Sequence, residues 1–188
     1  LGFLNVIINE DLYDKGFVEK WTNASFLVRV DTTELLREFE VVEGGSRDKF
    51  VVWDSSSNEP KSWNASTMEY SSPNVKPALE GLFEVMLTDG KPVECKTVWT
   101  MLKERVDEYT PEKVAEVTWV PEQKIVEAAR FYAKSKPAAV HWGVPVEAVA
   151  AATPTIQAIT HLWCITGNLD IPGGNVIARD AFNVSGYS

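Results

Sequence analysis

The sequence has little of what metal sites, disulfide scaffolds and nucleic-acid interfaces need. Of 188 residues, only Cys95 and Cys164 are cysteine and only His141 and His161 are histidine. No pair has metal-ligand spacing, and we expect both cysteines to be buried and unbonded. The 18 Lys and Arg residues are outnumbered by 27 Asp and Glu residues, for a formal net charge of −9. Because binding to nucleic acid needs clustered positive charge, no such partner is expected.

Long hydrophobic runs are also missing from the sequence. Stretches such as Val144–Ala152 are too short and too interrupted to cross a bilayer, so no direct membrane insertion is expected. The chain is nevertheless 45% apolar and 11% aromatic, which is enough for a sizeable core. Because it begins at Leu1, inside a predicted helix and without an initiator methionine, we expect a piece of a longer protein.

The first half of the chain changes from helical to β-rich character. Gly2–Trp21 predicts a helix that Gly16 weakens, followed by a second short turn through Phe17, Val18 and Trp21. Short strand-like runs follow, at Phe26–Val30, Phe50–Asp54, Leu82–Leu87 and Pro92–Thr97. The last two flank a Thr-Asp-Gly-Lys turn and predict a hairpin, whereas Ser55–Pro77, rich in Ser, Asn and Pro, predicts an irregular surface loop. We interpret residues 22–106 as a β-rich insertion within a single unit, residues 1–188.

The last third alternates helices with one apolar run. Three helix starts carry a proline, at Thr110-Pro111, Val120-Pro121 and Thr153-Pro154. Between the second and third, Ala138–Trp142 is typical of a buried strand in a parallel sheet. The predicted fold class is therefore α/β, mixed with α+β features, in which helices pack on a short, largely parallel sheet that carries the β-rich hairpin insertion.

The segment after this predicted strand is the candidate binding site. In open α/β sheets, ligands bind where strand ends lead into helices. Gly143 lets a ligand approach the backbone closely, Trp142 offers a stacking face, and Glu147 can accept hydrogen bonds from an amino-pyrimidine such as guanine or pterin. The alternative interpretation is structural, with Trp142 in the core and Gly143 beginning a turn.

A second candidate, Thr166–Asn175, contains three glycines and a proline and predicts a tight, fixed loop. It lacks the lysine and the position of a phosphate-binding loop, so we favour a structural role. No arrangement of paired carboxylates or of Ser, His and Asp stands out in the sequence. We therefore predict neither catalytic nor metal-ligating residues in this chain.

Three segments resemble the molybdopterin oxidoreductases of the DMSO reductase family. Leu1–Trp21 resembles the helix after the family's nucleotide-binding strand, and Glu108–Val144 resembles its two helices and a strand. Leu162–Val176 is similar to its Thr-Gly-Asn…Pro-Gly-Gly signature. The three segments occur in the family's order.

This resemblance implies a parent catalytic subunit that holds molybdenum or tungsten between two molybdopterin guanine dinucleotides, usually with an iron–sulfur cluster. The chain would be part of one dinucleotide-binding domain, catalytically silent alone and without cofactor when isolated. The family's cofactor-lining loop maps onto Trp142, Gly143, Val144, Pro145 and Glu147. Val146 stands where many members have a polar residue, and Glu147 is the candidate to replace it.

The resemblance also implies partners, namely the rest of the same subunit and an electron-transfer subunit. Family members occur in the cytoplasm and in the periplasm of prokaryotes, so the compartment stays open, as does the substrate. A hypothesis from another class is a free-standing, non-catalytic interaction domain. In that case the β-rich insertion, with Trp53 and Trp63, would dock a partner.

Overall fold

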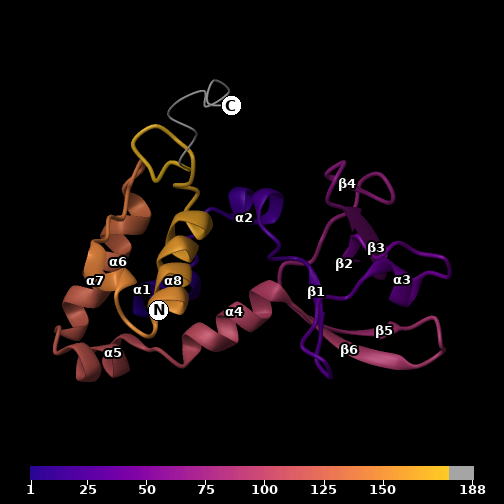
Figure 1. Cartoon of the computed structure of the whole chain (residues 1–188), viewed down its shortest axis with the longest axis horizontal. Helices are drawn as coiled ribbons and strands as arrows, with labels where there is room; N and C mark the ends of the chain where they lie inside the picture. The colour runs from indigo at the N-terminus through magenta and orange to yellow at the C-terminus, as the bar shows by residue number, and fades with distance from the viewer. Residues whose placement is uncertain (178–188) are drawn as a thin grey trace, which may run out of the picture. The chain divides into compact units, whose positions relative to one another are not determined.

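The computed structural model describes residues 1–177 and forms two compact units (Figure 1). The helical unit comprises Leu1–Phe17 and the chain from Tyr109 onward, and the β-rich unit comprises Val18–Glu108. Helices combine with two small sheets, which confirms the mixed α/β class. Both sheets are antiparallel, so the expected, largely parallel sheet is not found within residues 1–177. No helix in that range is long and apolar enough to cross a membrane.

The β-rich unit contains two three-stranded sheets. One sheet has the order β1 (Leu27–Arg29), β6 (Pro92–Thr97), β5 (Leu82–Met86). The other has the order β2 (Lys49–Asp54), β3 (Glu59–Asn64), β4 (Glu69–Tyr70). The unit also contains α3 (Glu38–Val41), α4 (Val98–Asp107) and the end of α2 (Lys15–Trp21). The predicted hairpin is confirmed as β5–β6, with Val85 opposite Val93.

The inward faces of these strands form one hydrophobic core. Its buried members are Leu27, Leu36, Val51, Val85, Val93 and Cys95. The two tryptophans that suggested a docking surface pack within the unit: the Trp53 ring stacks on Phe83 at 4.7 Å, and the Trp63 ring lies 5.1 Å from that of Phe26. Both indoles are half-buried. They therefore contribute to the packing of the sheets.

The prediction of an irregular loop over Ser55–Pro77 is wrong, because this stretch contains β3 and β4. A polar turn folds β3 back onto β2. The Asp54 carboxylate accepts hydrogen bonds from the Ser56 N–H at 3.0 Å, the Ser57 hydroxyl at 2.8 Å and the Lys76 N–H at 2.9 Å. The serines thus satisfy a buried carboxylate, whereas the sequence pattern suggested a solvated loop.

These hydrogen bonds predict that the β-rich unit loses stability in acid. Donation by the Lys76 N–H, followed by Ser56, holds the pKa of Asp54 well below its ordinary value. A carboxyl group whose pKa is lower in the folded state stabilises the fold above the unfolded pKa of about 4 and loses that contribution as the pH falls. We expect Asp54→Asn to lower the urea midpoint at pH 7 and to flatten its decline between pH 5 and 2. The exposed Asp48→Asn variant is the control, and a wild-type midpoint for Asp54→Asn at pH 7 would contradict this role.

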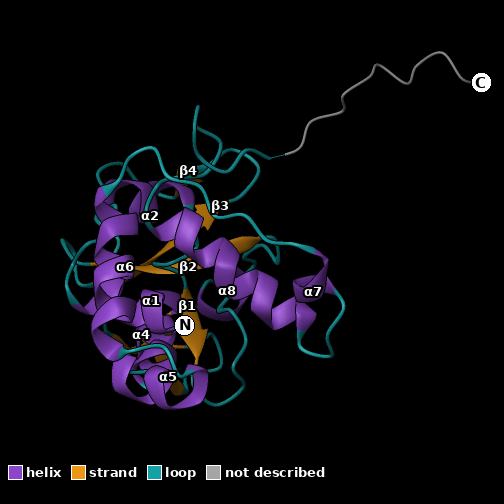
Figure 2. Ribbon diagram, turned by 90° about the vertical axis from the view of Figure 1, so that its left-hand side faces the viewer, coloured by secondary structure: helices purple, strands orange, loops and turns teal. Residues whose placement is uncertain are grey.

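The helical unit is built around α1 (Gly2–Asn9), which contacts three other helices (Figure 2). These are α5 (Pro111–Thr118), α6 (Glu122–Lys134) and α8 (Ala152–Ile165). Leu4 and Ile7 of α1 and Ile125 and Ala129 of α6 are buried. Their spacing matches the apolar face expected of amphipathic helices.

The predicted helical segment Gly2–Trp21 forms two helices, and the second includes the expected turn through Phe17, Val18 and Trp21, but the break lies before Gly16. The first ends at Asn9, and α2 (Lys15–Trp21) continues into the β-rich unit. Between them Asp11 adopts a positive φ of 53°, and the Asp14 N–H donates to the carbonyl of Ile165 at 2.7 Å. This interruption ties the N-terminal segment to the end of α8.

Two of the three predicted helix starts agree with the structure. The Thr110 hydroxyl accepts from the Lys113 N–H and caps α5, and α6 begins directly after Pro121. The third is displaced, because α8 begins at Ala152 and already contains Thr153 and Pro154. Proline is tolerated there because the first N–H groups of a helix have no intrahelical acceptor.

Candidate cofactor-binding site

The segment that leads to the candidate site is extended but pairs with no strand within residues 1–177. Ala138 and Val140 are half-buried, whereas Ala139 and His141 are exposed. The expectation of a buried strand in a parallel sheet is therefore wrong for the described chain. The physical reason is that side-chain amides, and not a neighbouring strand, meet its backbone: the N–H groups of Ala138 and Val140 donate to Asn168 at 3.0 Å and Asn175 at 2.8 Å.

A single helical turn, α7 (Val144–Glu147), follows this segment. Gly143 precedes it with φ −116° and ψ 176°, a conformation open to any residue. A Cβ atom built at Gly143 would meet only Pro145, at 3.6 Å. Val144 and Pro145 are exposed, and Val146 is half-buried. The fold itself therefore does not require glycine at position 143.

The structure brings two of the predicted binding residues together. The Trp142 indole N–H donates to a Glu147 carboxylate oxygen at 3.0 Å. The same indole stacks on Trp163 of α8, with ring centroids 5.4 Å apart and planes 13° apart. One face of Trp142 is thus covered by protein, and one carboxylate oxygen of Glu147 is already engaged.

The residues present fit a flat heterocycle that stacks on Trp142 and carries a hydrogen-bond donor edge. Trp163 has its indole N–H buried without a hydrogen-bond acceptor in the described part of the chain. Burying a donor without a partner costs free energy, but this N–H is covered by protein and does not face solvent, so the cofactor edge is assigned to the exposed loop. Glu147, which is exposed, has a second oxygen that its bond to Trp142 does not use. Stacking and edge hydrogen bonds are what a pterin or a guanine base can form.

An ion pair lies beside the start of the segment that leads to the site. Lys136, just before the extended segment, forms an ion pair with Asp14. The hydrogen bond from Lys136 is the largest cause of the lowered pKa of the Asp14 carboxyl, followed by the Phe17 N–H. Gly167, at φ +65°, lies against the same carboxylate, where a Cβ atom would come within 2.7 Å. In residues 1–177, no group of three or more His, Cys, Asp or Glu side chains could hold a metal ion.

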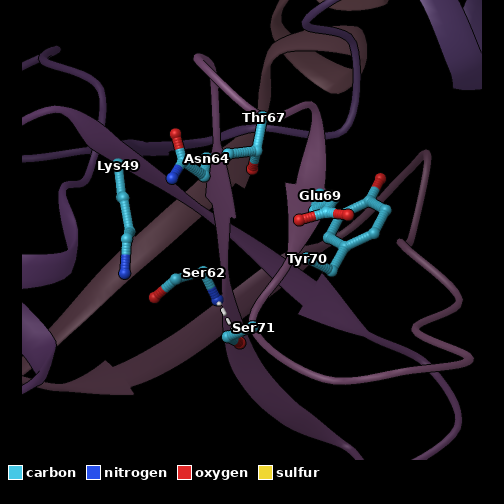
Figure 3. A pocket seen from close by; sticks show the side chains of 7 residues that line it. All are labelled: Lys49, Ser62, Asn64, Thr67, Glu69, Tyr70 and Ser71. Atoms are coloured by element: carbon cyan, nitrogen blue, oxygen red, sulfur yellow. Dashed lines mark hydrogen bonds between the residues drawn. The ribbon is translucent and has the colours of Figure 1, made fainter.

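Other hollows in the described part of the chain lie away from this loop. A largely apolar one of about 400 Å³ lies in the helical unit and is bordered by Leu1, Val114 and Ile125. A polar one of about 180 Å³ lies in the β-rich unit (Figure 3), lined by Lys49, Ser62, Asn64, Thr67, Glu69, Tyr70 and Ser71. It is smaller than the usual ligand pocket of about 300–1,000 Å³. The Lys49 ammonium there is neutralised by Glu38 at 3.2 Å.

Comparison with curated relatives shows which family the chain resembles. No family model matches the chain. The relatives are molybdopterin oxidoreductase catalytic subunits, and they align with most of the chain, which confirms the resemblance to this family. The chain corresponds to a segment of these catalytic subunits.

Three relatives illustrate the match. The chain is 34% identical to the perchlorate reductase subunit alpha of Dechloromonas aromatica (94% of the chain, 22% of the relative). It is 30% identical to the dopamine dehydroxylase of Eggerthella lenta (93% and 25%). It is 32% identical to the dimethylsulfide dehydrogenase subunit alpha of Rhodovulum sulfidophilum (93% and 19%). The chain therefore spans about a quarter or less of the length of these relatives.

Three residues at the site were not assigned a role from the sequence. They are Trp163, which lies just before the Thr166–Asn175 loop, and Asn168 and Asn175, which lie within it. In the sequence, Trp163 lies on the apolar face of a predicted helix. That position fits packing in the core as well as stacking on Trp142. The two asparagines flank the Asp-Ile-Pro-Gly-Gly turn, but nothing in their spacing indicated which backbone groups they bind.

Proposed function

We propose that this chain is a cofactor-binding segment of a molybdenum or tungsten oxidoreductase that uses molybdopterin guanine dinucleotide. The observation that carries the proposal is the 34% identity to a perchlorate reductase alpha subunit over 94% of the chain. The parent would hold two such dinucleotides and an iron–sulfur cluster, and residues 22–106 would be an insertion in one dinucleotide-binding domain. The isolated chain would be catalytically silent.

The loop Trp142–Glu147 is the part of the chain we assign to the cofactor. Trp142 would stack on the heterocycle with the face that Trp163 leaves open, and Glu147 would accept a hydrogen bond from an exocyclic amino group. Gly143, Val144 and Pro145 form the exposed backbone beside it. When bound, the cofactor supplies the redox-active metal centre of the parent enzyme. The protein's own contribution here is to bind and orient its organic part.

The proposed partners follow from the size and names of the relatives. The chain covers 22% of the perchlorate reductase subunit and 15% of the chlorate reductase subunit alpha of Ideonella dechloratans. We propose that the rest of the same catalytic subunit packs on this segment, and that an electron-transfer subunit serves the parent. The interaction-domain hypothesis is less well supported, because Trp53 and Trp63 pack inside the β-rich unit.

Equilibrium dialysis of the chain with pterin and with guanosine monophosphate tests the site. We expect weak binding, with a Kd of about 1 mM, equivalent to about −4 kcal/mol, because a single loop provides few contacts. Trp142→Ala and Glu147→Gln should each weaken binding about fivefold or more.

Gln157→Ala, an exposed change on α8, is the matched control and should bind like the wild type. Equal affinity of the wild type, Trp142→Ala and Glu147→Gln would contradict the assignment of this loop.

A further inference from the structure

The Thr166–Asn175 loop, which follows α8, also contacts the segment that leads to the candidate site. We propose that Asn168 and Asn175 are positioning residues whose side-chain amides bind the backbone of residues 138–140, hold it extended, and thereby set the orientation of the Trp142–Glu147 loop. The link to a cofactor rests on the proposed function. The positioning itself rests only on contacts within the helical unit.

Asn175 bonds to the extended segment as a strand partner would. Its side-chain oxygen accepts from the Val140 N–H at 2.8 Å, and its side-chain NH₂ donates to the Val140 carbonyl at 2.8 Å. This double exchange is the pattern of a hydrogen-bonded pair in an antiparallel ladder, in which both backbone groups of one residue are satisfied together. An amide side chain can reproduce it because it carries an acceptor and a donor side by side.

Asn168 binds the same segment two residues earlier, through its side-chain oxygen alone. Its side-chain oxygen accepts from the Ala138 N–H at 3.0 Å, and its NH₂ donates to the Thr166 hydroxyl at 2.9 Å. Ala138 and Val140 are two residues apart, so in an extended chain their N–H groups lie on the same edge. Asn168 is fully buried, which makes any loss of these bonds costly.

Backbone hydrogen bonds within the loop fix the positions of the two asparagines relative to each other. The Asn175 N–H donates to the Asn168 carbonyl at 2.9 Å, and the Asp170 N–H donates to the Asn175 carbonyl at 2.7 Å. Gly174 packs so closely that a Cβ atom would lie 2.4 Å from the Asn168 carbonyl oxygen. Gly173, at φ +82°, leaves no room for a Cβ atom beside Pro137.

This loop also positions the second indole of the site. The Asn168 N–H donates to the carbonyl of Trp163 at 2.9 Å, and Trp142 lies two residues beyond Val140. Trp142 is therefore linked to the Asn175 side chain through the extended segment, and Trp163 is linked to the Asn168 backbone at the end of α8. Loss of the Asn175 bonds should free Val140 and, with it, Trp142.

Hydrogen exchange and NMR of the 188-residue chain test this inference. In Asn175→Ala, we expect the Val140 amide to exchange at least tenfold faster than in the wild type. The ring-current shift of the Trp142 indole signal should diminish, because its stacking on Trp163 loosens. Asn175→Asp keeps the acceptor for the Val140 N–H and should retain part of that protection. Gln157→Ala should leave both signals unchanged.

Binding measurements separate this inference from the proposed function. If the wild type binds pterin or guanosine monophosphate, Asn175→Ala should weaken that binding by about threefold or more. Unchanged Val140 protection and an unchanged Trp142 signal in Asn175→Ala would overturn the positioning role. Faster Val140 exchange together with no ligand binding by the wild type would uphold the positioning and refute the proposed function.

Discussion

Replacing Leu27 by alanine is expected to lower the free energy of unfolding of the β-rich unit by about 3 kcal/mol. Leu27 is fully buried on β1 and belongs to the core that also contains Leu36, Val51 and Val85. The change removes apolar surface from the core and leaves a cavity that β1, hydrogen-bonded to β6, can close only in part. Amide exchange in β5 and β6 measures the loss, and about 3 kcal/mol corresponds to about a 100-fold faster exchange.

Leu82→Ala is the matched control for this prediction. Leu82 lies on β5 of the same sheet, but its side chain is 54% exposed. Its truncation should change stability by less than about 0.5–1 kcal/mol, as expected for a surface substitution. Equal effects of the two substitutions would mean that the core of the β-rich unit is not where the structure places it.

Gly174→Ala should have the second large effect, at about 2–3 kcal/mol of stability in the helical unit. The added methyl group would lie 2.4 Å from the Asn168 carbonyl oxygen and 2.8 Å from Ile171. Because the first of these neighbours is backbone, the loop must open, and Asn175 then loses its register with Val140. Urea unfolding measures the stability change, and hydrogen exchange at Val140 shows whether the extended segment is released.

Gly143→Ala is the control, because position 143 has room for a methyl group whereas position 174 does not. Its backbone conformation suits any residue, and the new methyl group would only touch Pro145 at 3.6 Å. We expect little change in stability but weaker ligand binding, because the methyl group would stand where a ligand approaches the backbone. Equal stability of the Gly174→Ala protein and the wild type would show that the loop does not close tightly.

The elements that the sequence predicted well are those with local signals. The β5–β6 hairpin carries its own turn, in which Gly90 has a φ of +81°, and α5 carries Thr110 as its cap. Such signals act within a few residues of each other, so they do not depend on the rest of the fold.

The errors concern segments whose structure is decided by distant residues. β3 contains Glu59, Pro60 and Lys61 and has little strand character, but it pairs over its full length with β2. The run Ala138–Trp142 has the composition of a buried strand, yet its hydrogen-bond partners are asparagine side chains 30 and 35 residues away. The local composition of these segments predicts neither the pairing of β3 with β2 nor the hydrogen bonds from the asparagines.

At the candidate site, too, the sequence indicated the local groups but not the contacts between distant residues. The sequence identified Trp142 and Glu147 as groups able to bind a heterocycle, and the structure places them in contact with each other. The stacking of Trp163 and the support from Asn168 and Asn175 depend on how α8 packs against the extended segment. They therefore became apparent only in three dimensions.

The proposal that this chain binds the organic part of a molybdopterin cofactor is tested most directly by residue-resolved NMR. Pterin and guanosine monophosphate are titrated separately into the isotopically labelled chain, and the amide and indole signals are followed. The account predicts saturable shifts centred on Trp142, Gly143, Val144 and Glu147, including the indole N–H signals of Trp142 and Trp163. Saturable shifts confined to the β-rich unit, or no shift at millimolar ligand, would contradict it.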